Sequence, residues 1–383
     1  MSAPRAPAAA GAIAQLDGAE ARRRQLAGAL LIDVRDDDER ALGMPDGALG
    51  MPGERLLREI AALASPEREV LLICAAGQRS LRIAQTLHTR GYQRVASVAG
   101  GFAYWLASGL PVQTGGLDAD TQDRYARQLC LPQVGATGQS RLAAARVALV
   151  GAGGLGAPAA LYLAAAGVGT LTLIDDDRVE RSNLHRQVLH ADARVGMAKV
   201  ESARMTLAAL NPRVQLVTHA TRVRAANVEA LLGGHDVVID GADNFATRYL
   251  LAAASLRLRL PLVYGAVERF SGQVSVFDPR RADSPCYRCL FPDPPAAADA
   301  PNCAEAGVLG VLPGVIGLLQ ATEVLKLLLG IGMPLVGRLL LFDALGMHFR
   351  ELLLPRDEAC PGCGATARFS GYEDLARLCA AAD

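Results

Sequence analysis

The sequence predicts two α/β domains, each built around a mainly parallel sheet. Its 383 residues exceed the length of one ordinary domain. Short apolar segments alternate with helical patterns in both halves, which is typical of a parallel sheet covered by helices. A polar, Gly-containing stretch without periodicity, residues 113–123, separates the halves. We therefore expect domains at residues 1–112 and 124–383 joined by this linker.

The first half carries a cysteine in a loop that favours a reactive thiol. Apolar segments at 30–35 and 69–74 have the composition of buried strands, and Cys74 ends the second in Cys74-Ala-Ala-Gly-Gln-Arg79-Ser. Ligands bind at the carboxyl ends of parallel strands, where backbone N–H groups, a helix N-terminus and Arg79 would lower the thiol pKa. A buried structural cysteine is the alternative interpretation.

Three segments in one order favour the reactive interpretation. Asp33-Val-Arg35, Cys74-x-x-Gly-x-Arg79 and Val98-Ala-Gly-Gly-Phe-x-x-Trp105 resemble a rhodanese (sulfurtransferase) domain. The resemblance implies that Cys74 carries sulfur as a persulfide. Met44 stands where such domains often have histidine, and an inert rhodanese-like module is the alternative.

The second half begins with a nucleotide-binding βαβ unit. An apolar strand at 147–150 runs into a glycine loop, an Ala/Leu-rich helix and a second strand at 171–174. Glycines let the backbone approach a phosphate, the helix N-terminus attracts the anion, and an acidic residue about 20 positions on accepts from the ribose hydroxyls. The predicted nucleotide-binding residues of this unit are Gly151, Gly153, Gly154, Gly156, Asp175 and Asp177.

Charged residues after this unit favour ATP over a dinucleotide. Arg186 and Lys199 are cations that would neutralise a polyphosphate, and Asp243 follows a buried strand at 236–240, where its carboxylate could hold Mg²⁺. This set fits nucleotidyl transfer better than the hydride transfer of an NAD-dependent oxidoreductase. Taken singly, each residue could instead be a surface ion pair, a solvated side chain or a turn former.

Two cysteine pairs predict a metal site. Cys286-x-x-Cys289 and Cys360-x-x-Cys363 can together complete a closed tetrahedral Cys₄ set, which is typical of structural zinc. The wide separation of the pairs means that the metal would link the end of the domain to its middle.

Composition excludes several classes of partner. Lys+Arg and Asp+Glu balance at 39 each, which gives no basic surface for nucleic acid. The longest apolar run, 306–321, is too short to span a membrane and predicts a buried or interface helix. Eight cysteines without a recognisable secretory signal favour a cytoplasmic protein.

Many motifs in one order across residues 121–365 resemble the MoeB/ThiF/HesA family, bacterial relatives of ubiquitin-activating enzymes. They are Arg124-Tyr-Ala-Arg127-Gln, the glycine loop, Asp175-x-Asp177, Ser182-Asn183-Leu-His-Arg186-Gln, Lys199, Asp243-Asn244, the two cysteine pairs and Asn302-Cys303-Ala-Glu-Ala-Gly307. The resemblance implies ATP-dependent adenylation of the C-terminal Gly-Gly carboxylate of a ubiquitin-like sulfur carrier, of the type of the molybdopterin synthase small subunit. Ser182, Asn183, Arg186, Lys199 and Asn244 would then hold the nucleotide, and Asp243 would hold Mg²⁺.

The resemblance also implies partners. Arg127 matches a family arginine that reaches into the other subunit's site, so a homodimer is expected. Cys303 is a candidate resolving thiol on a loop expected to be mobile, or a bystander. The sulfur donor, thiosulfate or a cysteine desulfurase, stays open, as do carriers for thiamin, cysteine or tRNA thiolation. An NAD-dependent oxidoreductase with a rhodanese appendage and a non-catalytic carrier-docking module are the alternatives of a different class.

Overall fold

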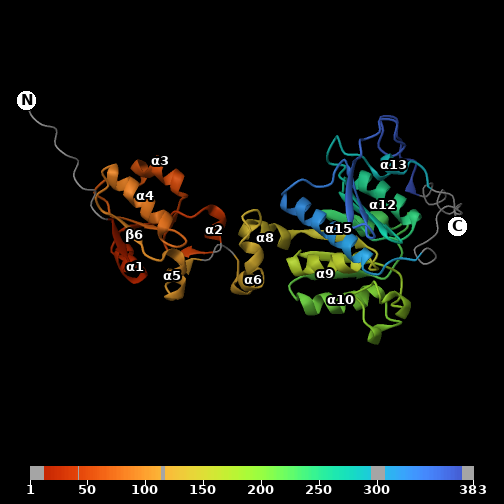
Figure 1. The fold of residues 1–383 in the computed structure, drawn as a ribbon, viewed down its shortest axis with the longest axis horizontal. Helices are drawn as coiled ribbons and strands as arrows, with labels where there is room; N and C mark the ends of the chain where they lie inside the picture. The colour runs from red at the N-terminus through yellow and green to blue at the C-terminus, as the bar shows by residue number, and fades with distance from the viewer. Residues whose placement is uncertain (1–12, 42, 114–116, 295–306, 373–383) are drawn as a thin grey trace, which may run out of the picture. The chain divides into compact units, whose positions relative to one another are not determined.

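Residues 13–41, 43–113, 117–294 and 307–372 are described in the computed structural model, which divides the chain into two units, residues 1–139 and 140–383 (Figure 1). Each unit contains its own sheet with helices packed on it. The predicted α/β class with mainly parallel sheets is therefore confirmed.

The first unit is built on a five-stranded parallel sheet in the order β1-β6-β5-β2-β4. Its centre is buried because β5 is an unbroken aliphatic segment with all four residues inaccessible, as expected for a strand covered on both faces. The strands of this sheet are β1 (Ala14–Leu16), β2 (Leu30–Asp33), β4 (Leu49–Gly50), β5 (Val70–Ile73) and β6 (Val95–Val98). The helices around it are α1 (Gly18–Leu26), α2 (Asp37–Ala41), α3 (Gly53–Leu63), α4 (Gln78–Thr89) and α5 (Gly101–Ala107).

The stretch expected to be an irregular linker, 113–123, contains regular structure at both ends. Gln113 belongs to β7 (Val112–Gln113), which pairs antiparallel with β3 (Met44–Pro45). The Asp118 carboxylate caps α6 (Ala119–Arg124) by accepting from the N–H of Thr121. Two further helices follow, α7 (Ala126–Leu129) and α8 (Gly135–Ala144). The domain boundary placed in this linker stays a prediction.

The second unit has an eight-stranded sheet in the order β10-β9-β8-β11-β12-β13-β14-β15. The first five strands in this order, β10, β9, β8, β11 and β12, run parallel to one another. Strands β13, β14 and β15 then pair antiparallel with their neighbours. The strands are β8 (Arg146–Val150), β9 (Thr170–Ile174), β10 (Gln215–His219), β11 (Val237–Asp240), β12 (Leu262–Glu268), β13 (Ser271–Phe277), β14 (Arg338–Asp343) and β15 (His348–Leu353). The helices are α9 (Gly156–Ala166), η1 (Arg181–Asn183), η2 (Asp192–Arg194), α10 (Lys199–Leu210), α11 (Val228–Leu232), α12 (Phe245–Leu258), α13 (Tyr287–Leu290) and α15 (Leu312–Leu329).

The long apolar helix differs from its prediction in extent. Helix α15 covers 312–329 and not 306–321, and its 18 residues with a mean hydropathy of 1.5 are enough to cross a membrane by length and composition. Beyond the apolar run the helix includes Glu323 and Lys326, which form an ion pair one turn apart. Half of this helix is buried inside the protein, where it packs on α9, β12 and β13 (Figure 1). It is therefore a core helix, as the sequence predicted.

Candidate functional site

The glycine loop lies between β8 and α9, as predicted. Gly151 has a φ of +94°, and a Cβ there would lie 2.5 Å from the carbonyl oxygen of Gly241. A Cβ on Gly156 would lie 1.9 Å from the carbonyl oxygen of Gly151, which no side chain permits. The two glycines allow the loop to turn tightly and α9 to start directly beneath it. The N–H groups at the start of α9 consequently face the carboxyl edge of the sheet.

A cleft of about 280 Å³ opens at this edge. It brings together nine of the twelve residues predicted to bind the cofactor: Gly151, Gly153, Gly154, Asp175, Asp177, Arg186, Lys199, Asp243 and Asn244. Gly156, Ser182 and Asn183 were predicted to bind but do not line it. Gly156 lies under the loop, and both oxygen-bearing side chains of η1 hydrogen-bond to Glu180.

Asp175 was predicted to bind ribose, and in the structure its carboxylate also braces the loop. It accepts from the N–H of Ala152 at 2.7 Å and from the N–H of Asp177 at 2.8 Å. Burial raises the pKa of this carboxyl above its ordinary value, although attraction to Lys199 and the two N–H donors oppose the rise. Each carboxylate oxygen can accept a further hydrogen bond, so the bracing leaves capacity for a hydroxyl donor.

Two cations form one wall of the cleft. Lys199 is the first residue of α10, is only 5% exposed, and places Nζ 2.7 Å from the carboxylate of Asp177. Arg186 donates to the side-chain oxygen of Asn183 at 2.6 Å. Asn183 therefore acts on the cleft by orienting Arg186, since it does not line the cleft itself.

The turn after β11 also lines the cleft. Asp243 is exposed there, and its Oδ1 lies 3.4 Å from the side-chain nitrogen of Asn244. Asn244 caps α12 by accepting from the N–H of Thr247 at 2.9 Å. Carboxylate and amide oxygens at the mouth of a cleft are ligands that Mg²⁺ prefers, so the side chains present fit that ion.

Sequence patterns missed several residues of the cleft. They are Thr221, Arg222 and Val223 after β10, Thr247 and Arg248 on α12, Val267 on β12, and Val308 and Pro313 before and at the start of α15. A signal existed only for Pro313, because proline is favoured in the first turn of a helix.

A buried ion pair beneath the cleft was also missed. Asp240 is fully buried, and its Oδ2 lies 3.8 Å from Nε of Arg248. Burial raises the pKa of Asp240 to about 6, although Arg248 and the N–H of Ala242 oppose the rise. Arg248 lies on a helix whose buried face is otherwise mostly apolar, so periodicity gives no sign of the pair.

The thiol of Cys74 lies at the end of β5 and the start of α4, as predicted. Its sulfur accepts from the N–H of Gly77 at 3.1 Å and from the Ser80 hydroxyl at 3.3 Å. Burial raises the pKa of the thiol. Hydrogen bonds from the Ser80 hydroxyl and from the N–H groups of Ala76, Gly77 and Ser80 together lower this pKa by a larger amount. The net pKa therefore lies below the ordinary value of a cysteine.

Arg79 was expected to lower this pKa, but it has another principal partner. Its guanidinium donates to Glu39 at 2.5 Å and lies 3.7 Å from Asp36. Its attraction to Cys74 is weaker than its interaction with Glu39. Hydroxyl and backbone donors, not the arginine, are therefore the main stabilisers of a thiolate in this loop.

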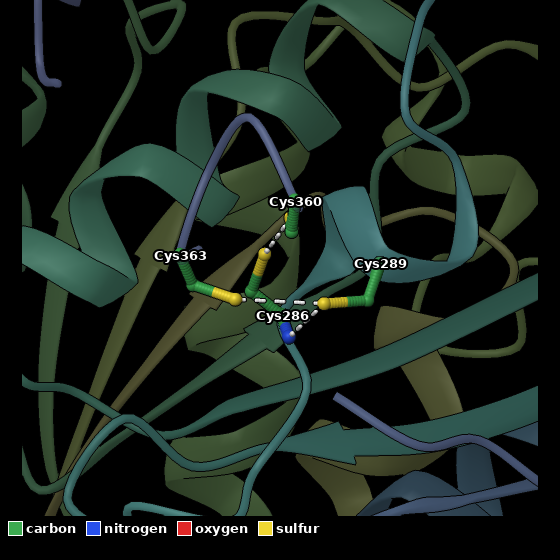
Figure 2. A group of neighbouring side chains, drawn as sticks. All are labelled: Cys286, Cys289, Cys360 and Cys363. Carbon is green, nitrogen blue, oxygen red and sulfur yellow. Dashed lines mark hydrogen bonds between the residues drawn. The ribbon is translucent and has the colours of Figure 1, made fainter. Parts of the chain in front are cut away.

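The four predicted zinc ligands converge (Figure 2). The sulfurs of Cys286 and Cys360 lie 3.6 Å apart, and those of Cys289 and Cys363 lie 3.5 Å apart. A disulfide needs about 2.05 Å, whereas sulfurs at the corners of a zinc tetrahedron lie about 3.8 Å apart. The cluster is therefore compatible with a structural zinc ion. Cys286 is the N-cap residue of the short helix α13.

Comparison with known proteins assigns the chain to a family. The model of the ThiF family matches residues 125–362, more than half of the chain, and that of the rhodanese-like domain matches residues 17–108. The chain belongs to the ThiF family. The predicted family and the predicted N-terminal rhodanese-like domain are both confirmed.

Curated relatives carry names of activating enzymes. A sulfur carrier protein adenylyltransferase of Thermus thermophilus is 53% identical over 63% of this chain and 90% of that protein. A SAMP-activating enzyme E1 of Haloferax volcanii is 51% identical over 65% of this chain and 91% of its own length. The match to an adenylyltransferase and sulfurtransferase MOCS3 of Anopheles gambiae is 46% identical and covers 69% of this chain but 59% of that protein.

Solved structures confirm the fold. Escherichia coli MccB, crystallised with MccA-N7isoASN, superposes with a TM-score of 0.57 at 22% identity over 63% of this chain and 75% of its own. At this identity the likeness concerns the ThiF-family fold alone.

Arg127 and Cys303 were also predicted to act in the reaction. Arg127 is exposed on α7 in the first unit. Cys303 lies outside the described residues, as do the other residues from 295 to 306. Their predicted roles stay predictions.

Replacing Ser80 by alanine is expected to raise the pH at which Cys74 becomes reactive. Only the thiolate is alkylated, and the variant loses a donor to that anion. One hydrogen bond of about 1 kcal/mol corresponds to a rate of iodoacetamide alkylation about 5-fold lower at pH 7. Peptide mapping of Cys74 across a pH series measures the shift. Ser80→Thr, which keeps the hydroxyl, should retain the wild-type profile, and an unchanged profile in Ser80→Ala would contradict the assignment.

Proposed function

We propose that this chain activates the C-terminal Gly-Gly carboxylate of a ubiquitin-like sulfur-carrier protein with ATP and then converts it to a thiocarboxylate. One observation carries the proposal: a cleft lined by the glycine loop, Arg186, Lys199 and Asp243 occurs in the same chain as Cys74, whose thiol pKa is lowered by hydrogen-bond donors. The first set suits adenylation, and the second suits sulfur transfer.

We infer the following roles in adenylation for the residues of the cleft. The glycine loop and the start of α9 receive the phosphates, Asp175 the ribose, and Arg186 and Lys199 the negative charge of the triphosphate. Asp243, with Asn244 beside it, would hold Mg²⁺, which neutralises phosphate charge when bound. The carrier's carboxylate attacks the α-phosphorus, the bond to pyrophosphate breaks, and an acyl-adenylate forms.

Sulfur transfer then replaces AMP. A persulfide on Cys74, loaded by thiosulfate or a cysteine desulfurase, attacks the acyl carbon with its outer sulfur, and AMP leaves. The product is an acyl disulfide between carrier and Cys74. A second thiol attacks the Cys74 sulfur, which releases the thiocarboxylate and leaves a disulfide on Cys74 for a cellular thiol to reduce. Cys303 is our candidate for the second thiol.

Other features support the setting of this reaction. The four-cysteine cluster would hold zinc in a structural role, because four protein ligands leave no open position. Arg127 would complete the cleft of the partner in a homodimer. None of the six cysteines within the described ranges forms a disulfide, which suits the reducing cytoplasm. A carrier of the molybdopterin synthase type is our first choice, with thiamin, cysteine and tRNA-thiolation carriers as alternatives.

Replacing Cys74 by alanine is expected to separate the two activities. The variant should form the acyl-adenylate of a carrier at the wild-type rate, because Cys74 belongs to the first unit and the cleft to the second. It should form no thiocarboxylate from thiosulfate, because the sulfur-carrying atom is gone. Mass spectrometry of the carrier distinguishes the two products.

The matched control is Cys130→Ser, which changes an exposed cysteine outside both sites. It should behave as wild type in both steps. Thiocarboxylate formation by Cys74→Ala at the wild-type rate would show that another group carries the sulfur.

A further inference from the structure

The backbone of the three residues before Asp243, residues 240–242, is fixed by hydrogen bonds. The Asp240 carbonyl accepts from the Gln320 side chain at 2.7 Å, and the Gly241 N–H donates to the Val150 carbonyl at 2.8 Å. The Ala242 N–H donates to the Asp240 carboxylate at 3.0 Å. Asp243 itself is exposed, so its direction depends on the backbone that carries it.

Arg248 closes this arrangement from the neighbouring helix. Its terminal nitrogen donates to the Ala242 carbonyl at 3.0 Å, and its Nε lies 3.8 Å from Oδ2 of Asp240. The guanidinium lies over the rings of Phe245 and Tyr264, at 5.6 and 5.7 Å from their centroids. Asp240 thus accepts from the N–H of Ala242 and Arg248 donates to its carbonyl, so the peptide groups on both sides of the Ala242 Cα are held.

Stability alone is a weak reason for such a pair. Desolvating two charges costs free energy that their attraction often fails to recover, and apolar replacements of buried ion pairs are frequently neutral or stabilising. Asp240 is fully buried and Arg248 is 8% exposed. Oδ2 of Asp240 accepts no hydrogen bond in the structure, so the pair is not optimised as an ion pair. What it does complete is the hydrogen bonding of the N–H and the carbonyl of Ala242, the residue directly before Asp243.

We infer that Asp240 and Arg248 are positioning residues. By hydrogen-bonding the N–H and the carbonyl of Ala242, they orient the Asp243 carboxylate into the cleft. They thereby set the affinity for the divalent cation that accompanies bound ATP. The inference rests on the proposed function, which assigns Asp243 to Mg²⁺. Neither residue contacts the cation. Their effect is to fix the orientation of the Asp243 carboxylate, as groups that hydrogen-bond to metal ligands do.

Replacing Arg248 by lysine tests this directly. Lysine keeps the positive charge but lacks the planar fork that reaches the Ala242 carbonyl and Asp240 together. We expect the Mg²⁺ concentration for half-maximal ATP binding, measured by titration calorimetry, to rise about 10-fold or more. In Asp240→Asn, whose altered side chain does not line the cleft, ATP binding without Mg²⁺ should be unchanged, because the glycine loop, Arg186 and Lys199 are untouched.

The control is Arg257→Lys, the same substitution on the same helix at an arginine that pairs with exposed Glu229. It should keep the wild-type Mg²⁺ requirement. Asp240→Asn keeps an oxygen for the Ala242 N–H but removes the charge facing Arg248, and it should also raise the requirement. If Arg248→Lys does not fold, Asp240→Asn decides alone.

Variants that unfold at lower temperature yet need no more Mg²⁺ than wild type would overturn the inference and leave the pair a structural one. A wild-type chain that binds no ATP, or binds it with no dependence on Mg²⁺, would instead contradict the proposed function. The two failures are therefore distinguishable.

Discussion

Replacing Lys199 by alanine is expected to lower carrier-dependent exchange of pyrophosphate into ATP by about 10²- to 10³-fold. The ammonium group lies on the wall of the cleft with its side chain almost fully buried, where little water screens its charge. Its present partner, Asp177, is mostly exposed and can turn to solvent when a polyphosphate arrives. Loss of this cation removes stabilisation from the transferring phosphoryl group.

The sequence offers an internal check on this prediction. Lysine occurs only at Lys199 and Lys326, so labelling by a lysine-reactive ATP analogue can be assigned to one of two peptides. The label should fall on Lys199, and ATP should protect it. Lys326 pairs with Glu323 in the core and should not respond to ATP. Exchange at the wild-type rate in Lys199→Ala would show that the cleft binds its ligand in another way.

Replacing Cys360 by serine is expected to destabilise the second unit by more than about 4 kcal/mol, the range associated with loss of a metal. The cluster joins the start of α13 to the segment after β15 (Figure 2). Tyr287, between the first two cysteines, packs edge-on against Tyr249 and Tyr264, at 5.1 and 5.4 Å between ring centroids. Metal loss would therefore loosen an aromatic cluster in the core.

Metal analysis and thermal unfolding measure this effect. Wild type should contain one zinc ion per chain, and a strong chelator should lower its unfolding midpoint as the substitution does. Cys130→Ser should keep both the metal and the midpoint, because Cys130 lies outside the cluster. A metal-free chain with an unchanged midpoint would contradict the assignment.

The sequence predicted well those features that depend on local chemistry. The glycine loop, the acidic residue ending β9 and the cysteine ending β5 are each fixed by a strand and the turn after it, so spacing along the chain was enough. The cysteine pairs were predicted because tetrahedral metal chemistry gives them a recognisable spacing.

The features that were missed depend on contacts between different helices, strands and loops. Arg248 reaches Asp240 across a helix–strand contact, and Pro313 joins the cleft because α15 packs on α9. Neither contact leaves a periodic signal. Arg79 was predicted to help lower the pKa of the thiol because Glu39, which lies 40 positions earlier, could not be placed beside it from sequence.

Exchange of labelled pyrophosphate into ATP, measured with wild-type chain and a panel of Gly-Gly carriers, tests the proposed function most directly. We predict that exchange requires both Mg²⁺ and one of the carriers. A carrier that lacks its terminal glycine should not support exchange. A chain that binds ATP but shows no exchange with any carrier would contradict it.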